Sequence, residues 1–170
     1  LKSPPKGATS FICSGVEPLS AAGPKTLNWI RRENRMGATL GGICTGAFAL
    51  AQANIIGNRS FTVHWENQPS FIESFQEHLP TQNLYEKDCR LITCGGGSAS
   101  TDMMLDLIET DHGREIAIVI SDMCIHKRAS ERQAPQKSSI SVAIGSRNQR
   151  LLHAIQVMNE TVEDPLPLLE

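Results

Sequence analysis

The sequence predicts an α/β fold with a mostly parallel sheet, because short β-rich runs alternate with helical patterns along the chain. Its 170 residues suit one compact domain, with room left for a fragment of a second. Hydrophobic residues make up 40% of the chain and charged residues 20%, which is typical of a globular protein and not of a disordered or fibrous one. The function must therefore be read from local motifs.

The first third of the chain predicts two strand–helix pairs. A short strand is expected at 8–13, followed by a helix at 24–35 that opens with a proline and carries apolar residues at helical spacing. A second strand is expected at 39–43 and a helix of small residues at 46–53. This alternation favours parallel pairing of the two strands.

The middle of the chain continues the pattern with shorter elements. The three glycines at 95–97 lack the Gly-Lys-Ser/Thr ending of a phosphate loop and the spacing of a dinucleotide site, so we expect a tight turn there and no cofactor. Met103 and Met104 are expected in the core. The expected elements are a strand at 61–64, a helix at 68–78, two extended pieces around a polar turn within 83–93, a helix at 99–111 capped by Ser98, and a helix at 115–125.

Charge and hydropathy exclude several classes of protein. Sixteen Lys and Arg against eighteen Asp and Glu give a net charge of −2, which does not predict nucleic-acid or membrane binding by the domain as a whole. No apolar run approaches the roughly 18 to 20 residues that span a bilayer, and the first residues lack the layout of a signal peptide. We therefore expect a cytoplasmic protein without membrane contact.

The five cysteines are an odd number and contain no Cys-x-x-Cys pair, so neither a disulfide framework nor a metal site is expected. Four of them stand in apolar or strand contexts and are interpreted as inert core residues: Cys13, Cys89, Cys94 and Cys124.

The composition of the chain changes after residue 126. Residues 127–147 are polar, poorly periodic and basic, which is typical of a linker. Residues 148–160 are amphipathic and predict the first helix of another domain. We therefore divide the chain into an α/β domain at 1–126, a basic linker at 127–147 and the start of a truncated domain at 148–170, and we expect the chain to be a piece of a longer protein.

Cys44 is the strongest candidate for a functional residue. It stands in the run Gly-Gly-Ile-Cys-Thr-Gly at 41–46, between a predicted strand and a predicted helix. Flanking glycines allow the tight strand-to-helix turn called a nucleophile elbow, which lifts one side chain out of the sheet edge. A helix N-terminus there would favour a thiolate, and the Thr45 N–H could face an oxyanion. The alternative is a small buried residue that happens to be cysteine.

Several motifs in this order resemble a known family. The run at 41–51, the strand end at 61–65 and the segment at 95–105 are similar to the ThiJ/PfpI domain of the class I glutamine amidotransferase-like superfamily. The string from Cys44 through Trp65, together with 125–128, Pro135-Gln136, 148–152 and 158–166, resembles AraC-family transcription regulators of the GlxA type. The resemblance covers most of residues 8–170.

The resemblance implies a three-layer, flavodoxin-like α/β sandwich with a mostly parallel sheet. In that family further strands usually precede the strand at 8–13, and the chain continues into two helix-turn-helix units, of which 148–170 would be only the opening helix. The implied partners are a small-molecule effector, DNA through a downstream domain that this chain lacks, and a second copy in a homodimer.

The resemblance and the residue chemistry together name a candidate site. His64 could act as a base toward Cys44, with Glu66 on the same side of an extended strand, or it could simply be bonded locally. Trp65 could face a ligand cation or merely pack. The candidate catalytic residues are Cys44 and His64, the candidate ligand-binding residues are Gly15, Val16, Cys44, Thr45, His64 and Trp65, and no metal ligands are expected.

Three functions remain open from the sequence. The first is a ligand-sensing domain of an AraC-type regulator that binds an amino-acid-like or amine metabolite near Cys44. The second is a cysteine-dependent hydrolase or hydratase; PfpI-type proteases carry His directly after the nucleophile, and Thr45 in that place weakens the protease reading. The third is a redox sensor in which Cys44 is oxidised.

Overall fold

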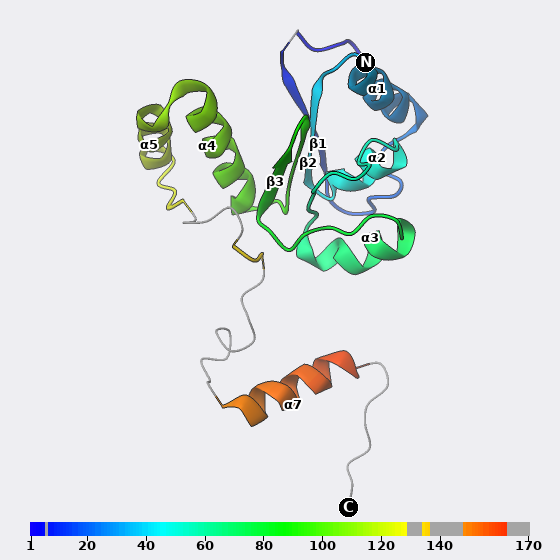
Figure 1. Ribbon diagram of the computed structural model, residues 1–170, viewed down its shortest axis with the longest axis vertical. Helices are drawn as coiled ribbons and strands as arrows, with labels where there is room; N and C mark the ends of the chain where they lie inside the picture. Colours follow the sequence, from blue (N-terminus) through cyan, green and yellow to red (C-terminus); the bar gives the residue numbers. More distant parts are fainter. Residues whose placement is uncertain (6, 129–133, 137–147, 163–170) are drawn as a thin grey trace, which may run out of the picture. The chain divides into compact units, whose positions relative to one another are not determined.

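The computed structural model describes residues 1–5, 7–128, 134–136 and 148–162. The chain divides into two compact units, Leu1–Gln136 and Lys137–Glu170 (Figure 1). Of the predicted basic linker, 129–133 and 137–147 lie outside the described residues. The first unit contains the sheet and every candidate site residue.

A four-stranded sheet in the order β1-β2-β4-β3 forms the centre of the first unit. Strands β1 (Thr9–Ser14), β2 (Thr39–Cys44) and β4 (Leu91–Cys94) are parallel, and β3 (Tyr85–Asp88) pairs antiparallel with β4. The register places Ser14 opposite Cys44, at the shared carboxyl edge of the parallel strands. The prediction of a mostly parallel sheet is confirmed.

Helices cover both faces of this sheet and make three layers (Figure 1). Helices α1 (Pro24–Arg35), α2 (Gly46–Gln52) and α3 (Gln68–Ser74) lie on one face. Helix α4 (Ser98–His112) lies on the other, and α5 (Arg114–Met123) packs against α4. The first helix has the predicted bounds because its proline occupies the first turn, where no backbone donor is lost.

Two separate apolar clusters correspond to the two faces. The larger contains Phe48 of α2 and Phe71 of α3, whose rings meet edge to face with centroids 4.9 Å apart. The smaller contains Ile92 of β4 and Met103 of α4. Met103 is therefore a core residue as predicted, whereas Met104 is 41% exposed and the core prediction for it is wrong.

Residues 61–64 do not form the predicted strand of the sheet. Thr62 makes only an isolated bridge with Thr81, and its N–H donates to the side-chain oxygen of Thr93 at 2.8 Å. The segment is extended and buried at Phe61 and Val63, but side chains and single backbone groups replace a strand ladder. A 3₁₀ turn, η1 (Trp65–Asn67), follows it.

Helix ends differ from the predictions where local backbone geometry prevails over periodicity. Helix α3 ends at Ser74 because Phe75, at φ −138°, leaves the helical region. Helix α4 begins at Ser98 with Gly97 as its N-cap, so the assignment of Ser98 as the cap is wrong. The predicted turn within 83–93 is confirmed and has Cys89 in the left-handed region at φ 54°.

The second unit contributes one described helix, α7 (Gln149–Glu160). Asn148 caps it, with its side-chain oxygen accepting from the N–H groups of Arg150 at 3.1 Å and Leu151 at 3.4 Å. The helix predicted at 148–160 is thus confirmed. Among the helices of the described residues, none combines the length and apolar character that crossing a bilayer requires.

Candidate functional site

Cys44 is held in a strained backbone conformation at the end of β2. Its φ of 59° lies in the left-handed region, which a residue with a side chain rarely occupies. Thr45 is the N-cap of α2, so the chain turns from strand to helix directly after the cysteine. Cys44 is half-buried. This is the geometry that the glycine pattern predicts, and it presents the thiol at the carboxyl edge of the sheet.

Three glycines make this turn possible because the backbone approaches too closely for a side chain. A Cβ on Gly42 would lie 2.7 Å from the Ala47 nitrogen, and one on Gly46 would overlap the carbonyl oxygen of Ile12. A Cβ on Gly96, at the end of β4, would lie 2.8 Å from the Cβ of Cys44. Glycine is therefore required on the strand, on the helix and on the neighbouring turn.

The segment after residue 62 is joined directly to Cys44. The N–H of His64 donates to the carbonyl oxygen of Cys44 at 3.3 Å. The rings of His64 and Trp65 lie with centroids 5.6 Å apart, and Trp65 is 39% exposed. The structure therefore brings together Cys44, His64 and Trp65, three of the residues named from the sequence.

A hydrogen bond from the Thr45 side chain joins Thr45 to Gly15. The Thr45 hydroxyl donates to the carbonyl oxygen of Gly15 at 2.9 Å, and the Thr45 N–H donates to the carbonyl oxygen of Ser14 at 3.4 Å. The Thr45 N–H that could face an oxyanion thus has a partner in this structure. Val16 follows on the connecting loop with 91% of its surface exposed.

His64 is bonded to its own turn. Its Nδ1 accepts from the N–H of Glu66 at 3.4 Å, and the Glu66 carboxylate lies 4.0 Å from the same nitrogen. A neutral imidazole that accepts at Nδ1 carries its proton on Nε2, where it can donate a hydrogen bond but cannot take a proton. Glu66 is largely exposed, so its charge interacts only weakly with the ring.

Gln136, which has no predicted role, is hydrogen-bonded to the segment that carries His64 and Trp65. Its side-chain oxygen accepts from the Trp65 N–H at 2.9 Å, and its side-chain nitrogen donates to the Val63 carbonyl oxygen at 3.1 Å. The one available signal was the pair Pro135-Gln136 within an otherwise featureless polar stretch. Contacts that join residues so distant in the chain leave no periodic pattern.

The other cysteines do not share one environment. Cys94 is fully buried, and burial raises the pKa of its thiol, partly offset by the N–H groups of Gly96 and Cys44. Cys13, Cys89 and Cys124 are exposed, so the core prediction is wrong for these three. Cys13 lies on β1 at the edge of the described sheet, Cys89 in the turn between β3 and β4, and Cys124 directly after α5.

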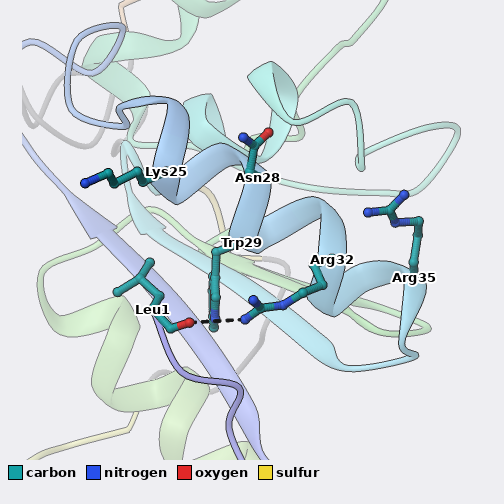
Figure 2. A pocket seen from close by; sticks show the side chains of 6 residues that line it. All are labelled: Leu1, Lys25, Asn28, Trp29, Arg32 and Arg35. Carbon is teal, nitrogen blue, oxygen red and sulfur yellow. Dashed lines mark hydrogen bonds between the residues drawn. The ribbon is translucent and has the colours of Figure 1, made fainter.

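A hollow lies on α1, lined by none of the candidate site residues (Figure 2). It has a volume of about 400 Å³, and a hydrogen bond of 3.3 Å joins Arg32 to the carbonyl oxygen of Leu1 across it. None of the residues named from the sequence as site residues lines this hollow. Its lining residues are Leu1, Lys25, Asn28, Trp29, Arg32 and Arg35.

Across the ranges that the structure describes, no three His, Cys, Asp or Glu side chains gather in a way that could hold a metal ion. The candidate site therefore consists of a thiol, an imidazole, an indole and backbone groups. Such a set can bind a small molecule by hydrogen bonds and by contact with an aromatic ring.

The sequence is similar to regulators of transcription. It is 40% identical over 165 residues to the HTH-type transcriptional regulator CdhR of Pseudomonas aeruginosa, covering 97% of this chain and 49% of the relative. It is 37% identical over 159 residues to the HTH-type transcriptional regulator GlxA of Rhizobium meliloti, covering 93% and 49%. The chain thus spans about half the length of these curated relatives. No family model matches the sequence.

Solved structures with a similar fold include a ThiJ/PfpI family protein from Pseudomonas syringae, with a TM-score of 0.63 and 21% identity, covering 92% of this chain and 62% of that one. An AraC family transcriptional regulator from Pseudomonas putida matches with a TM-score of 0.55 and 19% identity, covering 61% and 56%. At these identities the likeness establishes the fold, and the predicted three-layer α/β class is confirmed.

Replacing Gly46 by alanine should destabilise the first unit by about 1–3 kcal/mol, because the added methyl would overlap the Ile12 carbonyl. Urea denaturation measures the change. Gly23→Ala is the matched control, since a Cβ there meets nothing within 4 Å; as Gly23 is the N-cap of α1, a loss of less than about 1 kcal/mol is expected from alanine there. Equal stability losses in the two variants would contradict the steric account of the turn.

Alkylation by iodoacetamide at pH 8 should rank the thiols by exposure and pKa. The exposed Cys13 and Cys124 should react first, the half-buried Cys44 more slowly, and Cys94 last, because its raised pKa leaves little thiolate. Peptide mass spectrometry over a time course gives each rate. Faster labelling of Cys94 than of Cys124 would contradict the buried, protonated state assigned to Cys94.

Proposed function

The chain belongs to the AraC-like, HTH-type transcriptional regulators that carry a ThiJ/PfpI-type domain, and from that premise we propose that its first unit senses a small effector. The effector binds at the carboxyl edge of β2, beside Cys44, His64 and Trp65. In open α/β sheets ligands bind outside the carboxyl ends of the strands, which is where these residues lie. A DNA-binding domain beyond this chain reads the promoter.

The observation that carries the proposal is the joining of the Cys44 turn to an imidazole and an exposed indole. The 3.3 Å bond from the His64 N–H to the Cys44 carbonyl ties the thiol turn to the segment that carries both rings. Two groups that a cysteine catalyst would need are already engaged, which favours binding over catalysis. The Thr45 N–H, which would stabilise an oxyanion, is bonded to the Ser14 carbonyl oxygen, and the Nδ1 of His64, which would act as the base, accepts from the N–H of Glu66.

The ring of Trp65 favours an amine or amino-acid-like effector. A cation over an indole face gains about 0.5 to 2 kcal/mol, more when water is excluded. The Glu66 carboxylate stands next in sequence and could complement the same positive charge. The Nε2–H of His64 and the Cys44 thiol can serve a carboxylate or another polar group on the effector.

Effector binding would act by shifting an equilibrium between two arrangements of a dimer. Curated relatives about twice as long as this chain are named HTH-type transcriptional regulators, which supports DNA as the partner of the complete protein. A protein that acts on a promoter works where the DNA is, and a cytoplasmic location is part of this proposal. The homodimer follows from the family resemblance and is part of the proposal.

The strained turn at Cys44 also favours a second candidate, a cysteine-dependent hydrolase or hydratase. A φ of 59° at a strand-to-helix turn is the geometry of nucleophile elbows. A catalyst of this kind would turn over amides or aldehydes and lose that turnover in Cys44→Ala. Oxidation of Cys44, the third reading, would appear by mass spectrometry as added oxygen after mild peroxide.

Titration with amino acids and quaternary amines, followed by thermal unfolding, tests the sensing proposal. An effector at about 100 times its Kd should raise Tm by about 5–10 °C. Trp65→Leu should reduce this rise, by up to about two thirds for a loss of about 2 kcal/mol, whereas Trp29→Leu, on the remote helix α1, should lower the starting Tm but keep the rise. A rise that keeps its full size in Trp65→Leu and Cys44→Ser together would contradict this site.

A further inference from the structure

The side-chain amide of Gln136 is bonded on both of its polar atoms, mostly to the segment that carries His64 and Trp65. Its nitrogen has two hydrogens and lies within hydrogen-bonding distance of three acceptors, the Thr62 hydroxyl at 2.8 Å, the Val63 carbonyl at 3.1 Å and the Asn83 carbonyl at 2.9 Å, so one hydrogen is shared. Its oxygen accepts from the Trp65 N–H at 2.9 Å. One side chain therefore supplies the partners that a neighbouring strand would supply to residues 62–65.

The backbone around Gln136 is held as well. Residues 134–136 lie antiparallel to 82–84, with a bridge between Pro135 and Asn83 and two flanking hydrogen bonds of 3.2 and 3.0 Å. Gln136 is the last residue of the first unit, and the chain passes into the second unit at Lys137. Residues 134–136, at the end of the first unit, are thus bonded to the segment that carries His64 and Trp65.

Glycines fill the space between Gln136 and Cys44. A Cβ on Gly95 would overlap the amide of Gln136, and a Cβ on Gly96 would lie 3.2 Å from the Cα of Cys44 and 3.4 Å from its sulfur. Residues 62–65 are therefore anchored twice, to Cys44 through the His64 N–H and to Gln136 through the Trp65 N–H.

We propose that Gln136 is a positioning residue that holds the His64–Trp65 wall against Cys44 and couples this wall to the segment leading into the second unit. A ligand that moves the wall must lengthen or break bonds to the Gln136 amide, and that change acts on residues 134–136 directly. The coupling role rests on the proposed sensing function, whereas the positioning role does not.

Amide hydrogen exchange of the chain, followed residue by residue by NMR, tests the positioning role. Gln136→Met keeps the length of the side chain and removes its hydrogen bonds, so the Trp65 amide should exchange about tenfold faster. Amides of α1 should keep their rates. Gln52→Met is the matched control, because its amide bonds only to the Leu19 carbonyl, at 2.8 Å, among the contacts described. Faster exchange throughout the chain, or an unchanged Trp65 rate, would overturn the proposal.

Carboxamidomethylation of Cys44 by iodoacetamide tests the coupling without effector or DNA. With the exposed cysteines Cys13, Cys89 and Cys124 replaced by serine, alkylation should change the exchange of the Leu84 and Gln136 amides. The same alkylation in the Gln136→Met background should leave the Leu84 rate unchanged. An equal response in both backgrounds, or none in either, overturns the coupling and leaves the proposed sensing function to its own test.

Discussion

The candidate site depends on the close approach of three backbone segments around Cys44. Gly42, Gly46 and Gly96 each stand where a Cβ would collide with a neighbouring atom. This packing holds Cys44 at φ 59°, a conformation with a cost of about 1–3 kcal/mol that only the surrounding structure can maintain. The thiol is thereby fixed at the sheet edge and left half-exposed.

Residues 62–65, which are bonded to this rigid turn, are held in place by a different kind of contact. Residues 62–65 have no strand ladder, and their backbone groups depend on Thr93, Cys44 and Gln136. A segment held by a few discrete bonds can change its arrangement at a lower cost than a strand in the middle of a sheet. A rigid turn joined to a segment that can rearrange suits a protein that reports binding, since a ligand must favour one of two arrangements to have any effect.

Local patterns predicted those parts of the fold that local physics determines. The helix Pro24–Arg35 and the turn at Cys44 follow from proline, glycine and periodicity, and they appear as predicted. The strand expected at 61–64 does not appear, because the side chains of Thr93 and Gln136 and single backbone groups bond to it in place of a neighbouring strand, an arrangement that no local pattern shows. The role of Gln136 could not be predicted for the same reason. The exposure of Cys124 could not be predicted because burial depends on how the elements pack.

DNA binding by the complete regulator, measured with and without a metabolite that stabilises the first unit, tests the central claim most directly. Reciprocal coupling predicts that such a metabolite changes promoter affinity by about 5- to 150-fold. When Trp65 is replaced by leucine, the change should need a higher concentration of metabolite, by up to about 30-fold, with the affinity in the absence of metabolite retained. Promoter affinity that ignores every metabolite bound beside Cys44 would contradict the sensing account.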